Sequence, residues 1–254
     1  MNESIIKFLS KPKLKEPVLI EGLPGMGYVG KLAAEHLVVE LEAEKFAELY
    51  SPYFPHHVYV EKGGVVRLVR NEFYWASPSG KDIIILIGDV QAISPEGHYE
   101  VTKKILDLAK QLGVKQLFTI GGYATGRYPR GRPKVIGVAS DPELMEICKK
   151  HGAVIEEGDG PIVGASGLLL ALGKLWGMRG ICLLCETHGM VVDHRAAQSV
   201  LEVLTKILGI EVDMSELELR ARETERLISR MRKDMELKAR KEKRRMEEEA
   251  WYIG

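Results

Sequence analysis

The feature that most constrains the fold of this chain is the sequence DIIILIGD at residues 82–89. Five consecutive Ile and Leu side chains follow Asp82, and a β-strand points successive side chains to opposite faces of its sheet. Both faces of this strand must therefore be covered. Strands buried on both faces occur almost only in parallel sheets that carry helices on each side. The run is also far shorter than the roughly 20 residues of a membrane-spanning helix.

Strand-like and helix-like segments alternate along the first 212 residues. The strand-like runs are 17–23, 57–61, 64–69, 115–124, 134–139 and 179–189, and Gly63-Gly64 joins the second and third as in a hairpin. The helix-like segments are 28–42, 96–112, 141–151, 164–176 and 194–208. This alternation predicts an α/β fold, with a mostly parallel sheet and helices on both faces. We expect residues 1–212 to form one core domain.

Residues 213–254 differ sharply in composition from the rest of the chain. From Ser215 to Ala250 charged residues of both signs dominate, and Gly and Pro are absent. Such a segment predicts a solvated helical arm with many charged pairs one turn apart. Small or apolar residues recur at alternating spacings of four and three, which is typical of a coiled-coil seam or of a helix docked on a partner. These seam residues are Leu217, Ala221, Thr224, Ile228, Met231 and Met235.

The arm ends in an apolar tip formed by Trp251, Tyr252, Ile253 and Gly254. Chain ends are usually polar and frayed, so two aromatic residues here need an explanation. The tip either folds back onto the core or anchors a partner protein, because aromatic side chains supply most of the energy at such contacts.

The charge of the chain restricts its partners. Lys plus Arg number 36, as do Asp plus Glu, so the formal net charge is zero. Nucleic acids and acidic membranes both favour a basic excess, and we expect neither as a partner. A basic run at 127–132 can meet an acidic protein surface. The first 17 residues lack the apolar stretch of a signal peptide, which indicates a cytoplasmic protein. Scarce Asn and abundant Glu, Lys and Arg are typical of thermophile proteins.

A glycine motif follows the first apolar strand. Gly25, Gly27 and Gly30 match the G-x-G-x-x-G spacing between a strand and a helix, which in dinucleotide-binding proteins lets the backbone approach a pyrophosphate. The acidic residue that should end the second strand of such a fold is not evident. The alternative is a tight strand-to-helix turn that needs glycine whatever it binds.

Polar residues follow three of the predicted strands. Asp89, Glu186 and His188 stand at or just beyond strand ends, where open parallel sheets gather their ligands. They can form an acid–base cluster, or each can make structural hydrogen bonds. The pair Cys182 and Cys185 lies in an apolar strand, on opposite faces, and no second Cys or His pair completes a zinc site. We therefore expect no metal and no cofactor.

Together, several of these segments resemble the proteasome assembly chaperone 2 family, including its archaeal-type homologues. The resemblance covers about residues 15–210. It rests on the order and spacing of GLPGMGYVG at 22–30, GDVQ at 88–91 with Glu96 and Tyr99, Gly121-Gly122, GASGLLL at 164–170 and ETHG at 186–189.

The resemblance implies a phosphorylase-like α/β sandwich without that enzyme's active-site residues. It implies homo- or hetero-oligomers, some of which bind proteasome α-type subunits without nucleotide hydrolysis. Several members dock a C-terminal hydrophobic–Tyr–any-residue tail between α subunits. Trp251 and Tyr252 match the first two positions, although two residues follow Tyr252 where the motif has one.

Three functions follow as hypotheses. The first is a non-enzymatic, oligomeric binding protein that presents the tip at 251–254 to α-type proteasome subunits. The second is a phosphorylase- or hydrolase-like enzyme that uses Asp89, Glu186 and His188. The third is a nucleotide sensor that uses Gly25, Gly27 and Gly30.

Overall fold

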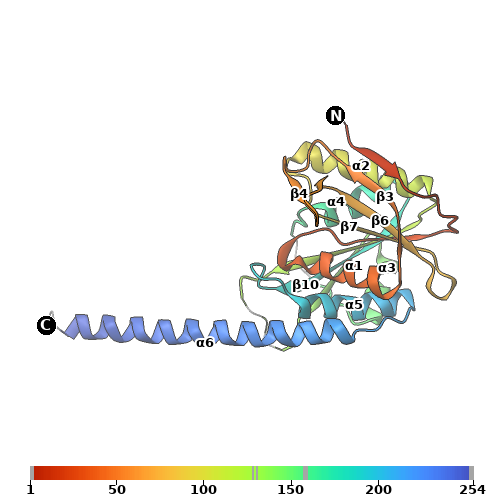
Figure 1. Ribbon diagram of the computed structural model, residues 1–254. Helices are drawn as coiled ribbons and strands as arrows, with labels where there is room; N and C mark the ends of the chain where they lie inside the picture. Colours follow the sequence, from red (N-terminus) through yellow and green to blue (C-terminus); the bar gives the residue numbers. More distant parts are fainter. Residues whose placement is uncertain (1–2, 128, 130, 157–159, 252–254) are drawn as a thin grey trace.

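A computed structural model describes residues 3–127, 129, 131–156 and 160–251 of the chain (Figure 1). Within these residues, eight strands form one sheet in the order β1-β3-β6-β7-β2-β8-β10-β9. Their bounds are β1 Ile5–Phe8, β2 Val18–Glu21, β3 Glu44–Tyr50, β6 Asn71–Ala76, β7 Ile83–Gly88, β8 Gln116–Ala124, β9 Val135–Ala139 and β10 Arg179–Thr187. The predicted α/β class is confirmed.

The parallel part of the sheet is its centre. Strands β7, β2, β8 and β10 are parallel to one another. On one side β6, β3 and β1 continue the sheet in antiparallel fashion, and on the other side β9 is antiparallel to β10. The expected parallel arrangement therefore holds for the centre of the sheet. The antiparallel flank was not expected, because β1, β3 and β6 were not predicted as strands.

Helices cover both faces of the sheet, as the apolar strands require. Helices α1 (Val29–Glu40), α3 (Pro142–Lys150) and α5 (His194–Leu208) pack on one face. Helices α2 (Pro95–Gln111) and α4 (Ala165–Gly173) pack on the other. Strand β7 shows why both layers form, since Ile83, Ile85 and Ile87 contact the first core and Ile84 and Leu86 the second.

The helix starts carry the signals that the sequence shows. The side chains of Ser94, Asp141 and Asp193 cap α2, α3 and α5 by accepting hydrogen bonds from the backbone N–H groups of Gly97, Leu144 and Ala196. Pro follows the cap directly in α2 and α3, where its missing N–H has no helical partner to lose. These local signals explain why most helix bounds agree with prediction to within two residues.

A two-stranded hairpin stands apart from the main sheet. Strands β4 (Val58–Val60) and β5 (Val66–Leu68) pair antiparallel. Gly63 and Gly64, both with positive φ, make the turn, which confirms the hairpin expected from the sequence.

The last helix, α6 (Ser215–Trp251), leaves the core and projects from it as a single rod (Figure 1). At 1.5 Å per residue, its 37 residues span about 55 Å. Its first half lies along α5. The division of the chain into a core at 1–212 and an arm from 213 onward stays a prediction. Among the described residues, no helix combines the length and apolarity needed to cross a bilayer.

Candidate functional site

The segments that follow the central strands meet at the carboxyl edge of the sheet. Gln91, just beyond β7, joins two of them: its Nε2 donates to the carbonyl oxygen of Pro24 at 2.7 Å, and its Oε1 accepts from the N–H of Ala165 at 2.9 Å. The loop after β2, the loop after β7 and the start of α4 are thus held together by one amide side chain.

The glycines of this edge allow close backbone contacts within the chain. A Cβ atom on Gly30 would lie 2.3 Å from the carbonyl oxygen of Ile120, and one on Gly122 would lie 2.1 Å from that of Met26. Gly27 has a φ of +63° and lies against Thr187. The crevice between β2 and β8, where a dinucleotide would enter, is therefore filled by the 24–28 loop itself. This packing accounts for Gly27 and Gly30 without a nucleotide, and Gly25 begins the same turn.

Asp89 anchors the hairpin. Its carboxylate accepts two hydrogen bonds from the guanidinium of Arg67, at 2.5 and 3.0 Å, and a third from the N–H of Arg70 at 3.1 Å. Partial burial alone would raise the pKa of Asp89, but the bonds from Arg67 and Arg70 outweigh it and hold the pKa below its usual value. The carboxylate is fully engaged in a structural role.

The predicted acid–base cluster of Asp89, Glu186 and His188 does not come together. Glu186 lies on β10, and β2 and β8 separate that strand from β7. At about 4.8 Å between neighbouring strands, the axes of β7 and β10 are about 14 Å apart. Glu186 accepts a hydrogen bond from the N–H of Lys134 at 3.3 Å. His188 lies half-buried in the loop after β10. These residues lie at the same edge of the sheet, but β7 and β10 are too far apart for them to form one cluster.

A buried carboxyl group that we did not predict lies beneath this edge. Glu21, at the end of β2, is 1% exposed; its Oε1 accepts from the N–H of Leu23 at 2.9 Å and its Oε2 from the hydroxyl of Ser166 at 2.9 Å. Burial raises the pKa of Glu21 to about 7, although these two hydrogen bonds act to lower it. The signal in the sequence was a single Glu inside the apolar run at 17–23.

The three cysteines are buried and unpaired. Burial raises the pKa of each thiol above its usual value, which keeps the thiols protonated and unreactive at neutral pH. Within the described part of the chain, no three His, Cys, Asp or Glu side chains are grouped as metal ligands would be.

The first four seam residues of the arm are buried within the chain itself. Leu217, Ala221, Thr224 and Ile228 are at most 7% exposed. The Nδ1 atom of His194 on α5 lies 3.0 Å from the Thr224 hydroxyl. Burial, followed by the charge of Arg220, lowers the pKa of His194. The seam therefore fastens the root of α6 to α5, and only its far end remains open to a partner.

Beyond the root, the arm turns its seam to solvent. Met231 is 36% and Met235 62% exposed. The described side chains between residues 233 and 237 are all exposed. Helix α6 extends to Trp251, and the remaining tip residues, Tyr252, Ile253 and Gly254, lie outside the described residues.

A sequence model of the PAC2 family matches residues 19–232. The chain belongs to the PAC2 family. It is 41% identical to the uncharacterised protein MJ1210 of Methanocaldococcus jannaschii, over 95% of this chain and 93% of that protein.

Solved structures agree with the family assignment. The crystal structure of Pyrococcus furiosus PbaB, described as an archaeal proteasome activator, is 45% identical with a TM-score of 0.85, over 91% of this chain and all of that one. P. furiosus PbaA, described as an archaeal homologue of proteasome-assembly chaperone, is 30% identical with a TM-score of 0.72, over 91% of this chain and 98% of that one. The family match ends at residue 232, within helix α6.

The PAC2 core exposes an apolar surface that we did not predict from the sequence. In the hairpin register, Val58 lies opposite Leu68 and Val60 opposite Val66, so these four side chains share one face. They are between 49% and 70% exposed. The other face carries Tyr59 and Arg67, with the guanidinium carbon of Arg67 4.6 Å from the Tyr59 ring centroid. The β-branched residues predicted a hairpin, but only the anchoring of Arg67 by Asp89 decides which face points outward.

Proposed function

We propose that this chain is a non-enzymatic binding protein that assembles into homo-oligomers and docks on α-type proteasome subunits through the tip of its arm. The observation that carries the proposal is the arm itself. Its last buried seam residue, Ile228, lies 23 positions before Trp251, so the end of α6 at Trp251 lies about 35 Å along the helix from Ile228. A charged rod of this length with an aromatic end is suited to reach a separate protein.

The relatives support the choice of partner. PbaB is described as a proteasome activator and PbaA as a homologue of proteasome-assembly chaperone, and both share the fold of this chain. Trp and Tyr bury large areas in a partner's pocket at small entropic cost. A tip of this size binds weakly alone, so several arms on one oligomer would supply the avidity.

The hairpin supports self-association. Its outward face of Val58, Val60, Val66 and Leu68 is an exposed apolar surface, of the kind that marks an interaction site. A two-stranded ribbon is also marginally stable without further packing. Glu61 beside the turn pairs with Arg67 of its own chain at 3.0 Å, so the proposed contact between copies is the apolar face itself.

The test is a pull-down with purified α-type proteasome subunits. We expect capture by the full chain and a loss of roughly tenfold or more for the double variant Trp251→Ala/Tyr252→Ala and for a chain ending at Ala250. Leu237→Ala, which changes an exposed apolar residue in the middle of the arm, is the matched control and should capture normally. Equal capture by the tip variants and the full chain would defeat docking through the tip.

A further inference from the structure

The segments at the carboxyl edge of the sheet are uncharged. They are residues 22–30, 90–95, 121–126 and 187–192, at the ends of the four parallel strands. None of them contains Asp, Glu, Lys or Arg, although these four residue types make up 28% of the chain. His188 is their only side chain that ionises near neutral pH. A surface of this composition is not suited to bind a phosphate or another charged ligand.

These segments expose large apolar side chains instead of charges. Six such residues are between 43% and 83% exposed. They form a surface that we call the uncharged rim: Met26, Tyr28, Ile93, Tyr123, Met190 and Val192. Loss of charge together with Tyr and Met is the composition that distinguishes the core of a protein–protein interface from ordinary surface.

Met26 lies at the centre of the uncharged rim. A Cβ atom on Gly122 would lie 3.1 Å from the Cβ of Met26, and one on Gly189 would lie 3.8 Å from its Sδ. Because Tyr123 and Met190 directly follow these two glycines, both flank Met26. The rim therefore continues from one strand end to the next.

Backbone and amide hydrogen bonds hold the segments of the rim together. The N–H of Gly27 donates to the carbonyl oxygen of Gly189 at 3.4 Å, and that of Asp193 donates to the carbonyl oxygen of Gly27 at 2.9 Å. The side chain of Gln91 donates to the carbonyl oxygen of Pro24 at 2.7 Å. The rim is thus already ordered, and a partner that binds it meets little entropic cost of ordering loops.

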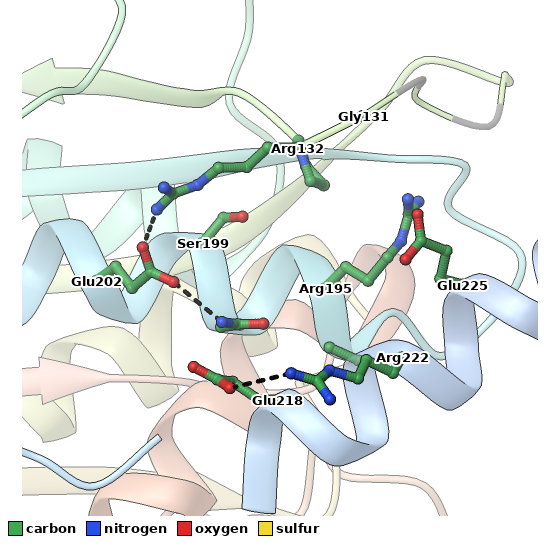
Figure 2. A pocket seen from close by; sticks show the side chains of 11 residues that line it. Gly131, Arg132, Arg195, Ser199, Glu202, Glu218, Arg222 and Glu225 are labelled. Carbon is green, nitrogen blue, oxygen red and sulfur yellow. Dashed lines mark hydrogen bonds and ion pairs between the residues drawn. The ribbon is translucent and has the colours of Figure 1, made fainter. Parts of the chain in front are cut away.

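The surface beside the root of the arm has the opposite character. At the junction of α5 and α6, Arg132 pairs with Glu202, and Arg222 lies 3.8 Å from Glu218 (Figure 2). Charged side chains of this kind are the usual cover of a protein surface in water. The lack of charge at the rim is therefore a local property and not a general feature of the chain.

The size of the rim fits an interface with another protein. A large side chain has an area of about 200 Å², so six of them at these exposures present roughly 600 Å². Each partner in a standard interface buries about 800 Å². The hairpin supplies the remainder, because it adjoins the rim: the N–H of Ile93 donates to the carbonyl oxygen of Tyr53, in the segment that leads to β4, at 3.1 Å.

A second copy of the chain is the partner that this surface fits best. A twofold axis places the same patch of two copies face to face, so that charged patches near the axis meet like charges. The uncharged rim can meet its own copy without such repulsion.

We propose that the uncharged rim packs against the uncharged rim of a second copy, in an isologous contact that continues beside the hairpin. The inference rests on the self-association proposed from the hairpin and adds the surface that makes up most of the contact. Met26, at the centre of the rim, lies near the twofold axis, and Ile93 and Met190 lie on either side of it.

The first experiment measures the mass of the full chain in solution by light scattering. Ile93→Lys/Met190→Lys places charges at two exposed positions of the rim and should reduce the wild-type mass to that of one chain. Val39→Lys is the matched control, since Val39 is 63% exposed near the end of α1 that points away from the rim, and it should keep the wild-type mass.

The outcomes separate this contact from the proposed function. A wild-type mass for Ile93→Lys/Met190→Lys would refute the contact through the rim, and self-association through the hairpin would still stand if Val60→Lys/Val66→Lys lowers the mass. If the rim variant keeps its mass but loses capture of α-type subunits, the rim faces a subunit and the proposal is wrong.

The second experiment does not depend on a disruptive substitution. The three natural cysteines are buried, so a short bifunctional thiol reagent reports on an introduced cysteine. Met26→Cys should give a covalent dimer, because the two copies of this residue lie close together across the axis, and Val39→Cys should give none. Absence of a covalent dimer with Met26→Cys would overturn the proposal.

Discussion

Glu21 is a carboxyl group that is buried in the protein, where its charged form is destabilised. It ends the central strand β2, with Ser166 and the N–H of Leu23 as its hydrogen-bond partners. In its protonated form it can donate a hydrogen bond in place of carrying a buried charge. Burial therefore raises its pKa to about 7, far above the value of about 4.3 for an exposed Glu.

The stability of the protein should depend on this group between about pH 4.5 and 7. The folded state holds the proton of Glu21 in this window and the unfolded state has lost it, so the contribution of Glu21 to the free energy of unfolding falls as pH rises. Glu21→Gln keeps the shape and removes the titration. Between pH 4.5 and pH 8, the free energy of unfolding of the variant should rise by at most about 3 kcal/mol relative to that of the wild type.

Urea unfolding at several pH values measures this difference. Glu143→Gln, which changes an exposed carboxylate, should follow the wild type closely. A constant difference between Glu21→Gln and the wild type across the pH range would show that Glu21 is ionised in the folded protein.

At the scale of elements, helix α6 is two different structures in one helix. Its root is fastened to α5 by Leu217, Ala221, Thr224 and Ile228, all buried. From Met235 onward the described side chains lie in solvent, and the helix depends on its own charged pairs and propensity. One helix thus combines a packed anchor with a free rod.

Substitutions at buried and at exposed seam residues of α6 should differ in their effect on stability. Ile228→Ala removes a side chain that is 3% exposed and should destabilise the root by about 2 kcal/mol. Amide exchange over residues 221–231 should then become roughly 30-fold faster. Met235→Ala, at an exposed seam residue, should leave the rate of this exchange almost unchanged. Equal effects of the two substitutions would contradict the packing of the root.

At the scale of the whole molecule, two exposed parts of the chain are suited to contact other proteins: the hairpin and the arm. The hairpin is held by Asp89 through Arg67, and its outer face is apolar. A surface of this kind is suited to contact between copies, whereas the arm reaches beyond the core.

Disrupting the hairpin face should separate the copies. We expect the wild type to have a mass in solution that is a multiple of its 28.4 kDa chain. Val60→Lys/Val66→Lys introduces like charges at facing positions of that surface and should reduce the mass to that of one chain. Leu175→Lys, at an equally exposed apolar residue after α4, should keep the wild-type mass. Light scattering decides the result, and a single-chain mass for the wild type would refute self-association without bearing on the tip.

Several parts of this architecture could be predicted because their signals are local. The consecutive apolar residues 83–87 require cover on both faces, and Ser94, Asp141 and Asp193 mark helix starts. The flank could not be predicted in the same way. Strand β3 contains a register shift between Lys45 and Ala47 that breaks its alternation, and Glu48 lies opposite Glu72, where Lys45 and Arg70 compensate the like charges.

By itself, the sequence determined the order of helices and core strands, the hairpin turn and the existence of a charged arm. These depend on periodicity, caps and glycines, which act over a few residues. Only the tertiary structure decided that Asp89 pairs with Arg67, that two strands separate Glu186 on β10 from β7, and that Arg195 near the start of α5 is buried. Such contacts join residues far apart in the chain, and their partners follow from strand order and helix packing, which no local pattern encodes.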